Sequence, residues 1–153
     1  MGRRNRRSRT RSSTSAASRP KLPPIFLDEN LAGKRLPEGL RKDGLPVKLL
    51  HEEFQRGILD ADLFPLVGKQ RWILLTKDNQ IRRRPLEVDA LIAARLRVFV
   101  FESAEMTSEE MLDAFRGAVS AIDRVVKNQK PPFVMRIGRN GRVTALWPEP
   151  RKR

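Results

Sequence analysis

Two short apolar segments of the chain each end within two residues of an aspartate. Residues 24–27 are followed by Asp28, and residues 72–76 are followed by Lys77 and Asp78. Uninterrupted apolar strands are typical of parallel sheets that are covered on both faces. Ligands bind outside the carboxyl ends of such strands. The two aspartates therefore lie at the edge of the predicted sheet where ligands bind. Carboxylates from separate segments are suitable ligands for a divalent cation.

Strand and helix patterns alternate along most of the chain. Runs rich in β-branched, aromatic and other apolar residues predict strands, and stretches with helical signals separate them. The predicted strands are residues 25–28, 47–50, 72–76 and 98–101, and the polar segment 51–59 and the basic segment 80–84 are predicted to be loops. This alternation predicts an α/β fold, a three-layer sandwich with a mostly parallel central sheet.

The last third of the chain carries two local signals. Residues 107–110 have the capping-box sequence Thr-Ser-Glu-Glu, and apolar residues then recur at helical spacing. Asn140-Gly141 lies between short apolar runs at 133–137 and 142–146. Because Asn-Gly favours the tight turn between paired strands, we expect a long helix followed by a C-terminal β-hairpin.

The positive charge is concentrated at the start of the chain. The net charge is +14, and residues 1–21 hold eight basic side chains and no acid, which leaves +6 for residues 22–153. We expect residues 1–22 to be a disordered basic arm, 23–148 a single folded domain and 149–153 a basic tail. The arm is a candidate for contacts with nucleic-acid phosphates, through Arg3, Arg4, Arg6 and Arg7. An organellar transit peptide and a leader without function are the alternative interpretations.

The composition excludes several chemistries. The chain has no cysteine and one histidine, which excludes disulfides, thiolate metal sites and a zinc site of ordinary composition. Glycine-rich phosphate loops and a serine nucleophile elbow are also absent from the sequence. No apolar run is long enough for a membrane span, and the lack of cysteine is compatible with a reducing, cytoplasmic location.

Three aspartates are the candidate catalytic and metal-binding residues. Asp28 and Asp78 follow predicted strands, and Asp60 stands where a helix is expected to begin. Thr76 lies two residues before Asp78, and its hydroxyl could orient a carboxylate or a water. Each aspartate also has an ordinary structural interpretation: a turn or cap for Asp28, a strand-end turn for Asp78 and an N-cap for Asp60.

A basic triplet follows Asp78 closely. Arg82, Arg83 and Arg84 could hold the phosphates of a nucleic acid, and a solvated loop is the alternative. Glu102 follows the fourth predicted strand and could join the acidic site, although a surface acid is the commoner outcome. His51 is expected to be a surface or hydrogen-bonded structural histidine.

Three segments together resemble the PIN-like ribonuclease family, in particular the compact members that act as toxins in toxin–antitoxin pairs. They are Phe-Leu-Asp-Glu-Asn-Leu at 26–31, Gly-Ile-Leu-Asp at 57–60 and Ile-Leu-Leu-Thr-Lys-Asp at 73–78. Their order and spacing are similar to the family pattern, and the resemblance covers about residues 24–147. The chain departs from the pattern after Asp78, where Asn79-Gln80 replaces the usual acid and aromatic pair, so a fourth acid is not identified.

The resemblance implies a magnesium- or manganese-dependent ribonuclease. Asp28, Asp78 and Asp60, which is preferred over Asp62, would hold the metal, and Thr76 would be a supporting hydroxyl. The family also implies RNA as substrate, an antitoxin protein as partner and a homodimer as a common assembly. None of these follows from composition or spacing.

Two other function classes fit parts of the sequence. A nucleic-acid-binding protein with a degenerate, non-catalytic PIN-like core would keep the basic residues without a complete metal site. A receiver-like phosphoacceptor would use Asp28, Thr76 and Lys77, but such domains need an acidic pair after strand one and the acceptor aspartate on a middle strand. The second predicted strand ends in Leu49-Leu50-His51, which disfavours that reading.

Overall fold

The computed structural model describes residues 21–149, apart from 32, 55–57 and 59, and at residues 60 and 61 it describes the backbone. Six strands form one sheet in the order β2-β1-β3-β4-β5-β6. The first five are parallel to their neighbours, and β6 pairs antiparallel with β5. The α/β prediction with a mostly parallel sheet and a C-terminal hairpin is therefore confirmed.

The elements alternate as the sequence indicated. The strands are β1 (Ile25–Leu27), β2 (Val47–Leu49), β3 (Ile73–Thr76), β4 (Arg97–Phe101), β5 (Phe133–Ile137) and β6 (Val143–Trp147). The α-helices are α2 (Arg35–Lys42), α3 (Leu50–Glu53), α4 (Asp60–Lys69), α5 (Pro85–Ala94) and α6 (Ser108–Asn128), with single 3-10 turns η2 (Glu29–Leu31) and η3 (Ile81–Arg83).

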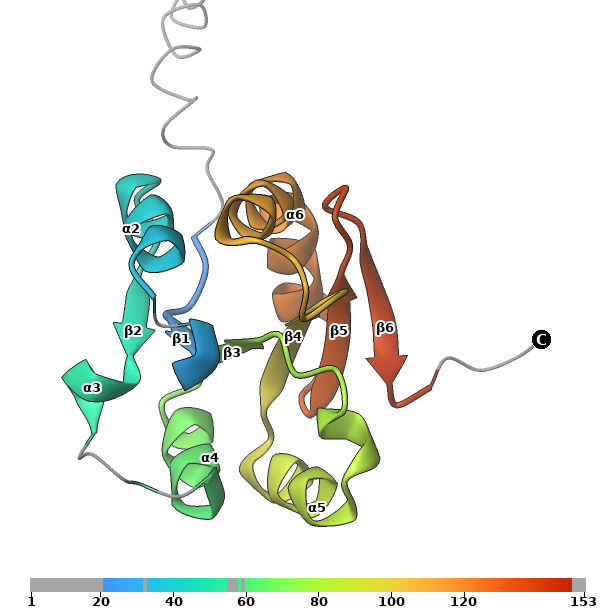
Figure 1. The fold of residues 1–153 in the computed structure, drawn as a ribbon. Helices are drawn as coiled ribbons and strands as arrows, with labels where there is room; N and C mark the ends of the chain where they lie inside the picture. Colours follow the sequence, from blue (N-terminus) through green and yellow to red (C-terminus); the bar gives the residue numbers. More distant parts are fainter. Residues whose placement is uncertain (1–20, 32, 55–57, 59, 150–153) are drawn as a thin grey trace, which may run out of the picture.

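Helices cover both faces of the sheet. Helices α2 and α6 lie on one face, and α4 and α5 lie on the other (Figure 1). Successive residues of a strand point to opposite faces, so Ile25 and Leu27 join the core under α2 and α6, while Phe26 joins the core under α4 and α5. Both cores need apolar residues, which explains why the strands are apolar without interruption.

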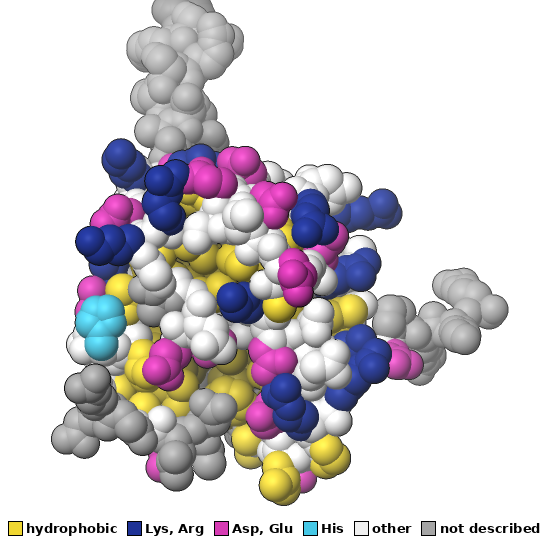
Figure 2. All heavy atoms as spheres, viewed as in Figure 1, with side chains coloured by type: hydrophobic (Ala, Val, Ile, Leu, Met, Phe, Trp, Pro, Cys, Tyr) yellow, Lys and Arg dark blue, Asp and Glu magenta, His cyan; other side chains and the backbone are white. Residues whose placement is uncertain are grey.

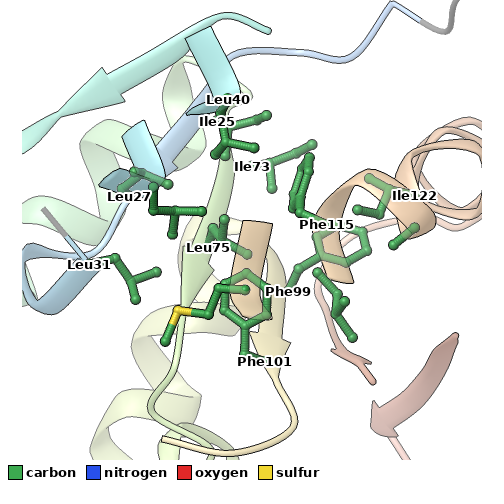
Figure 3. Packing of buried hydrophobic residues seen from close by; sticks show 14 of the residues in the cluster. Ile25, Leu27, Leu31, Leu40, Ile73, Leu75, Phe99, Phe101, Phe115 and Ile122 are labelled. Carbon is green, nitrogen blue, oxygen red and sulfur yellow. The ribbon is translucent and has the colours of Figure 1, made fainter. Parts of the chain in front are cut away.

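The larger core lies between the sheet and the pair α2 and α6. Phe99 and Phe101 of β4 pack there with Phe115 and Ile122 of α6 (Figure 3). All four side chains are fully buried. The predicted capping box fixes the start of α6, since the Thr107 hydroxyl accepts from the Glu110 backbone N–H and the Glu110 carboxylate accepts from the Thr107 backbone N–H. Helix α6 thus begins at the position that aligns its apolar face with the sheet.

Two local expectations were wrong. Residues 51–59 were expected to form a loop, but Leu50–Glu53 form helix α3. The Arg41 guanidinium donates to Glu52 at 2.7 and 3.2 Å, so a contact from α2 holds this short helix. Residues 80–84 were also expected to be a loop, but Ile81–Arg83 form the turn η3, in which the Ile81 side chain is buried.

Within the described ranges, no helix has both the length and the apolar character needed to cross a membrane.

Candidate metal and phosphodiester site

The site lies where β1 and β3 end side by side. The two strands are parallel and adjacent, with Leu27 opposite Leu75. The backbone N–H of Asp28 donates to the Leu75 carbonyl at 2.9 Å, which continues the pairing one residue beyond β1. The register therefore brings Asp28 beside Thr76, although 48 positions separate them in the sequence.

The hydroxyl of Thr76 connects the two aspartate segments. Its Oγ1 donates to Asp28 Oδ2 at 3.0 Å and accepts from the Asp78 backbone N–H at 3.1 Å. Thr76 is 3% exposed, and both bonds are partly buried, which reduces competition from water. Buried polar groups require partners, and the threonine meets that requirement by fixing Asp28 and the turn that contains Asp78.

The Asp78 carboxylate faces a guanidinium. Arg84 donates to both of its oxygens, from Nη1 to Oδ2 at 2.7 Å and from Nη2 to Oδ1 at 3.3 Å. The Gln80 backbone N–H also donates to Asp78 Oδ1, at 3.0 Å. Hydrogen bonds from Arg84 to Asp78, and then to Glu87, raise the pKa of the guanidinium above its ordinary value. The arginine is thus firmly cationic and neutralises the carboxylate.

Asp60 is the first residue of helix α4. Its side chain lies outside the described part of the chain, as do Gly57 and Leu59 of the same motif. The helix begins where the sequence predicted, and the Phe64 and Val67 side chains on its apolar face are buried. The participation of Asp60 in the site stays a prediction.

The basic triplet divides into different environments. Arg84 binds Asp78 and Glu87, Arg83 is exposed, and Arg82 has a buried Nε without a hydrogen-bond partner among the described residues. Lys, Arg, Asp and Glu side chains are intermixed on the face shown in Figure 2. The arm arginines Arg3, Arg4, Arg6 and Arg7 lie outside the described residues.

Two further candidates have other environments. The Glu102 carboxylate accepts from the backbone N–H and the guanidinium of Arg139, both at 3.1 Å. It therefore fastens the end of β4 to the turn between β5 and β6. His51 is exposed on α3, in agreement with the expected surface position.

The oxygen donors suit a hard cation, but they are not gathered into a cluster of three. Among the described side chains, no group of three or more His, Cys, Asp or Glu could hold a metal ion. Asp28 and Thr76 provide oxygens at one point, and Asp78 follows two residues later. The donor chemistry of Asp28, Thr76 and Asp78 fits magnesium or manganese.

Comparison with known proteins identifies the family. The family described as "PIN like domain" matches residues 23–103, which is more than half of the chain and contains Asp28, Asp60, Thr76 and Asp78. The chain belongs to the PIN-like domain family. The match ends two residues after β4, the strand that follows the candidate site in the sequence.

A bacterial relative supports the same assignment. The chain is 24% identical over 111 residues to the Mycobacterium tuberculosis (strain ATCC 25618 / H37Rv) protein named "Putative ribonuclease VapC45". The alignment covers 70% of this PIN-like chain and 80% of the relative. No solved structure gave a significant match.

The pairing of Asp78 with Arg84 was not predicted from the sequence. The triplet was expected to face a nucleic acid, and only its last member contacts the candidate site. Six residues separate Asp78 from Arg84, and because a turn and η3 lie between them, neither helix nor strand periodicity predicts the contact. Glu87, three residues after Arg84, was the one local signal, because it shares the same guanidinium.

Proposed function

We propose that this PIN-like protein is a magnesium- or manganese-dependent ribonuclease that hydrolyses RNA phosphodiesters. The observation that carries the proposal is the hydrogen bond from Thr76 to Asp28 across the carboxyl ends of β1 and β3. It joins two of the residues expected from the family pattern at the usual ligand position of a parallel sheet. The similarity to a protein named as a ribonuclease supports the same activity.

The chain's own residues have separate roles in this proposal. Asp28, Asp60 and Asp78 would hold the metal through carboxylate oxygens. The bound metal would lower the pKa of a water and stabilise charge on the attacked phosphate. Thr76 orients Asp28, since its hydroxyl donates to one carboxylate oxygen and leaves the other to face a different partner.

Arg84 would change partner when RNA binds. Its guanidinium spans a carboxylate in the present arrangement, and a phosphate offers the same bidentate geometry. Moving from Asp78 to a phosphate would release the carboxylate for the metal. Arg82, Arg83 and the N-terminal arm, including Arg3, Arg4, Arg6 and Arg7, would contact the RNA backbone.

The second candidate function is a non-catalytic nucleic-acid-binding protein with a PIN-like core. The observation in its favour is the neutralised Asp78, which has both oxygens engaged by Arg84. In that case the ion pair is the permanent state, and the aspartates have turn and cap roles.

Cleavage of a mixed pool of structured and single-stranded RNA separates the two functions. Purified protein would be assayed with Mg²⁺, with Mn²⁺ and with chelator, beside Asp28→Asn and Asp78→Asn. Asp113→Asn is the matched control, because it removes one carboxylate from the exposed side of α6. We expect metal-dependent cleavage that both site variants lose and the control keeps. RNA binding without cleavage in either metal would assign the non-catalytic function.

We infer a protein partner and self-association from the family resemblance. An antitoxin would be required if the ribonuclease acts as a toxin, and compact members often form homodimers. Three large apolar side chains of the α4–α5 layer are exposed, Leu66 at 38%, Leu86 at 82% and Ile92 at 46%, and apolar side chains are visible over α5 in Figure 2. Light scattering on the wild type and Leu86→Ser tests the homodimer. A monomer mass for both proteins would exclude it.

A further inference from the structure

A basic pocket lies at the end of the sheet opposite the aspartates. It has a volume of about 520 Å³. Its lining residues come from the C-terminal ends of α4 and α5 and from the segments at the starts of β3, β4 and β5. None of its lining residues is acidic, and four are basic: Lys69, Arg71, Arg95 and Arg97. A strand of five residues spans roughly 15 Å, so this pocket is separate from the site at Asp28.

Close packing of two helices brings the basic residues together. Helices α4 and α5 lie beside each other on one face of the sheet (Figure 1). A Cβ on Gly68 would overlap the Ala94 carbonyl oxygen, so only glycine permits this approach of the helix ends. The residues that follow the two helices therefore enter the same small region.

Both helices continue into a turn that places an arginine in the left-handed backbone region. Arg71 has φ 62° and Arg95 has φ 54°. The turns are equivalent, since Arg71 N–H donates to the Gly68 carbonyl and Arg95 N–H donates to the Ile92 carbonyl. Glycine or asparagine is the usual residue at such a position, because other side chains are strained there. The chain accepts that strain twice, and each time it places a guanidinium at the pocket.

Within the described ranges, the basic side chains of the pocket have no acidic partner. None of the four basic side chains forms an ion pair or hydrogen bond with any residue that the structure describes. The Nε of Arg97 is buried and has no hydrogen-bond partner in this part of the chain. Burial, and then the charges of Arg71 and Arg95, lower the pKa of Arg97. Buried polar groups without partners are unfavourable, and a bound anion would relieve this arrangement.

The negative ends of the helix dipoles offer a second explanation for cations here. That explanation suits Lys69, which is in the last turn of α4. It does not account for the guanidinium groups, because none of them donates to a carbonyl of the helix ends. It also gives no reason for left-handed arginine in place of glycine.

We propose that this pocket is a second anion site, which binds a phosphate-bearing ligand through Arg71, Arg95 and Arg97. Guanidinium groups bind phosphate oxygens in bidentate pairs, and the volume is in the range of small-ligand pockets. Convergence of the cations on one cavity favours clustered phosphates over a single charge. The phosphates belong to a free polyphosphate or to an RNA backbone, and the two sources share this chemistry. The site is independent of the proposed cleavage.

Binding of inorganic triphosphate and of a short single-stranded RNA tests the site. Titration calorimetry would be run at fixed ionic strength with chelator present, so that metal binding and cleavage do not contribute. The variant is Arg71→Gly with Arg95→Gly, which removes two cations and relieves both strained positions, so the fold should be kept. Arg124→Gln with Arg142→Gln is the control, because it removes two exposed charges from α6 and the segment before β6.

We expect the Gly variant to lose about tenfold or more in affinity for a phosphate probe, since charged hydrogen bonds are lost, while the control changes little. A loss seen with triphosphate assigns a free polyphosphate, and a loss seen with RNA alone assigns backbone phosphates. Equal losses of affinity in the variant and the control would show that only the net charge of the protein matters, which would overturn the proposal. Absence of binding by both probes would also overturn it. Arg97→Gln provides a second variant with the backbone unchanged.

Discussion

The guanidinium of Arg84 spans the carboxylate of Asp78, with Nη1 2.7 Å from Oδ2 and Nη2 3.3 Å from Oδ1. The ion pair is partly exposed, with 46% of the arginine side chain and 35% of the aspartate side chain accessible. Exposed pairs are weak because water and salt screen them. A metal ion can therefore compete for the Asp78 carboxylate, and a phosphate can compete for the Arg84 guanidinium.

Replacing Arg84 should strengthen metal binding. In Arg84→Gln the competing cation is removed, and we expect the affinity for Mn²⁺ to rise by roughly two- to fivefold, which corresponds to an exposed ion pair. Titration followed by electron paramagnetic resonance measures it. Arg83→Gln, an exposed neighbour outside the pair, is the control. An unchanged affinity in Arg84→Gln would mean that Asp78 is not a metal ligand.

Removing the Thr76 hydroxyl should affect both stability and cleavage. Thr76→Val keeps the shape of the side chain but leaves the Asp78 N–H without its acceptor and Asp28 without one donor. We expect the free energy of unfolding to fall by about 1–3 kcal/mol and RNA cleavage to decline. Thr76→Ser retains the hydroxyl and should recover most of the cleavage. Chemical denaturation and the RNA assay provide the readouts, and equal activity of the Val and Ser variants would contradict the role of the hydroxyl.

The pair Arg41–Glu52 should make stability depend on acid pH. The hydrogen bond from Arg41 lowers the pKa of Glu52 from its ordinary value of 4.5. A lowered pKa in the folded state contributes stability above the unfolded pKa, and this is lost as the pH falls through the folded pKa. Glu52→Gln should therefore reduce the free energy of unfolding at pH 7 by about 0.2–1 kcal/mol. The difference from wild type should disappear in acid below the lowered pKa of Glu52. Denaturant unfolding across this pH range measures it, with Glu38→Gln as the control.

Gly68→Ala should destabilise the α4–α5 layer. The new Cβ would meet the Ala94 carbonyl, which is backbone and cannot rotate away. We expect a loss of about 1–3 kcal/mol in the free energy of unfolding, as in other overpacked sites. Gly33→Ala has no atom within 4 Å of its added Cβ and should change little. Similar melting temperatures for the two variants would show that the helices separate easily.

Deleting residues 1–21 should flatten the salt dependence of RNA binding. Each arm cation that contacts a phosphate of single-stranded RNA contributes roughly 0.7 to the slope of log affinity against log salt. An arm of the same length built from Gly and Ser is the control for chain length. Fluorescence anisotropy at several salt concentrations measures the slope, and an unchanged slope would remove the arm from RNA binding.

The sequence predicted the fold well because its signals are local and agree with one another. Apolar runs identify strands that are buried on both faces, and the capping box at Thr107 and the turn at Asn140 mark where α6 and the hairpin begin. Helix α3 was missed because it has four residues and is held by Arg41 from another helix. Such a contact leaves no periodic pattern in the sequence.

The candidate site was predictable only in part. Asp28 and Thr76 were recognised individually from strand ends, and their contact follows from the position of β1 beside β3 in the sheet. The engagement of Asp78 by Arg84 depends on the path of a turn and could not be read from spacing. Arg71, Arg95 and Arg97 were not singled out, because isolated basic residues before strands look like solvated positions until two helix ends bring them together.

The packing of Phe115 and Ile122 against Phe99 and Phe101 has a consequence for evolution and for engineering. The match to the family covers residues 23–103 and ends before α6 begins. Without α6 the Phe99 and Phe101 side chains would be exposed to water, so we expect that residues 23–103 do not fold on their own. Any graft, truncation or recombination that separates the aspartates from this C-terminal helix would divide one cooperative structure, however well the family pattern is preserved.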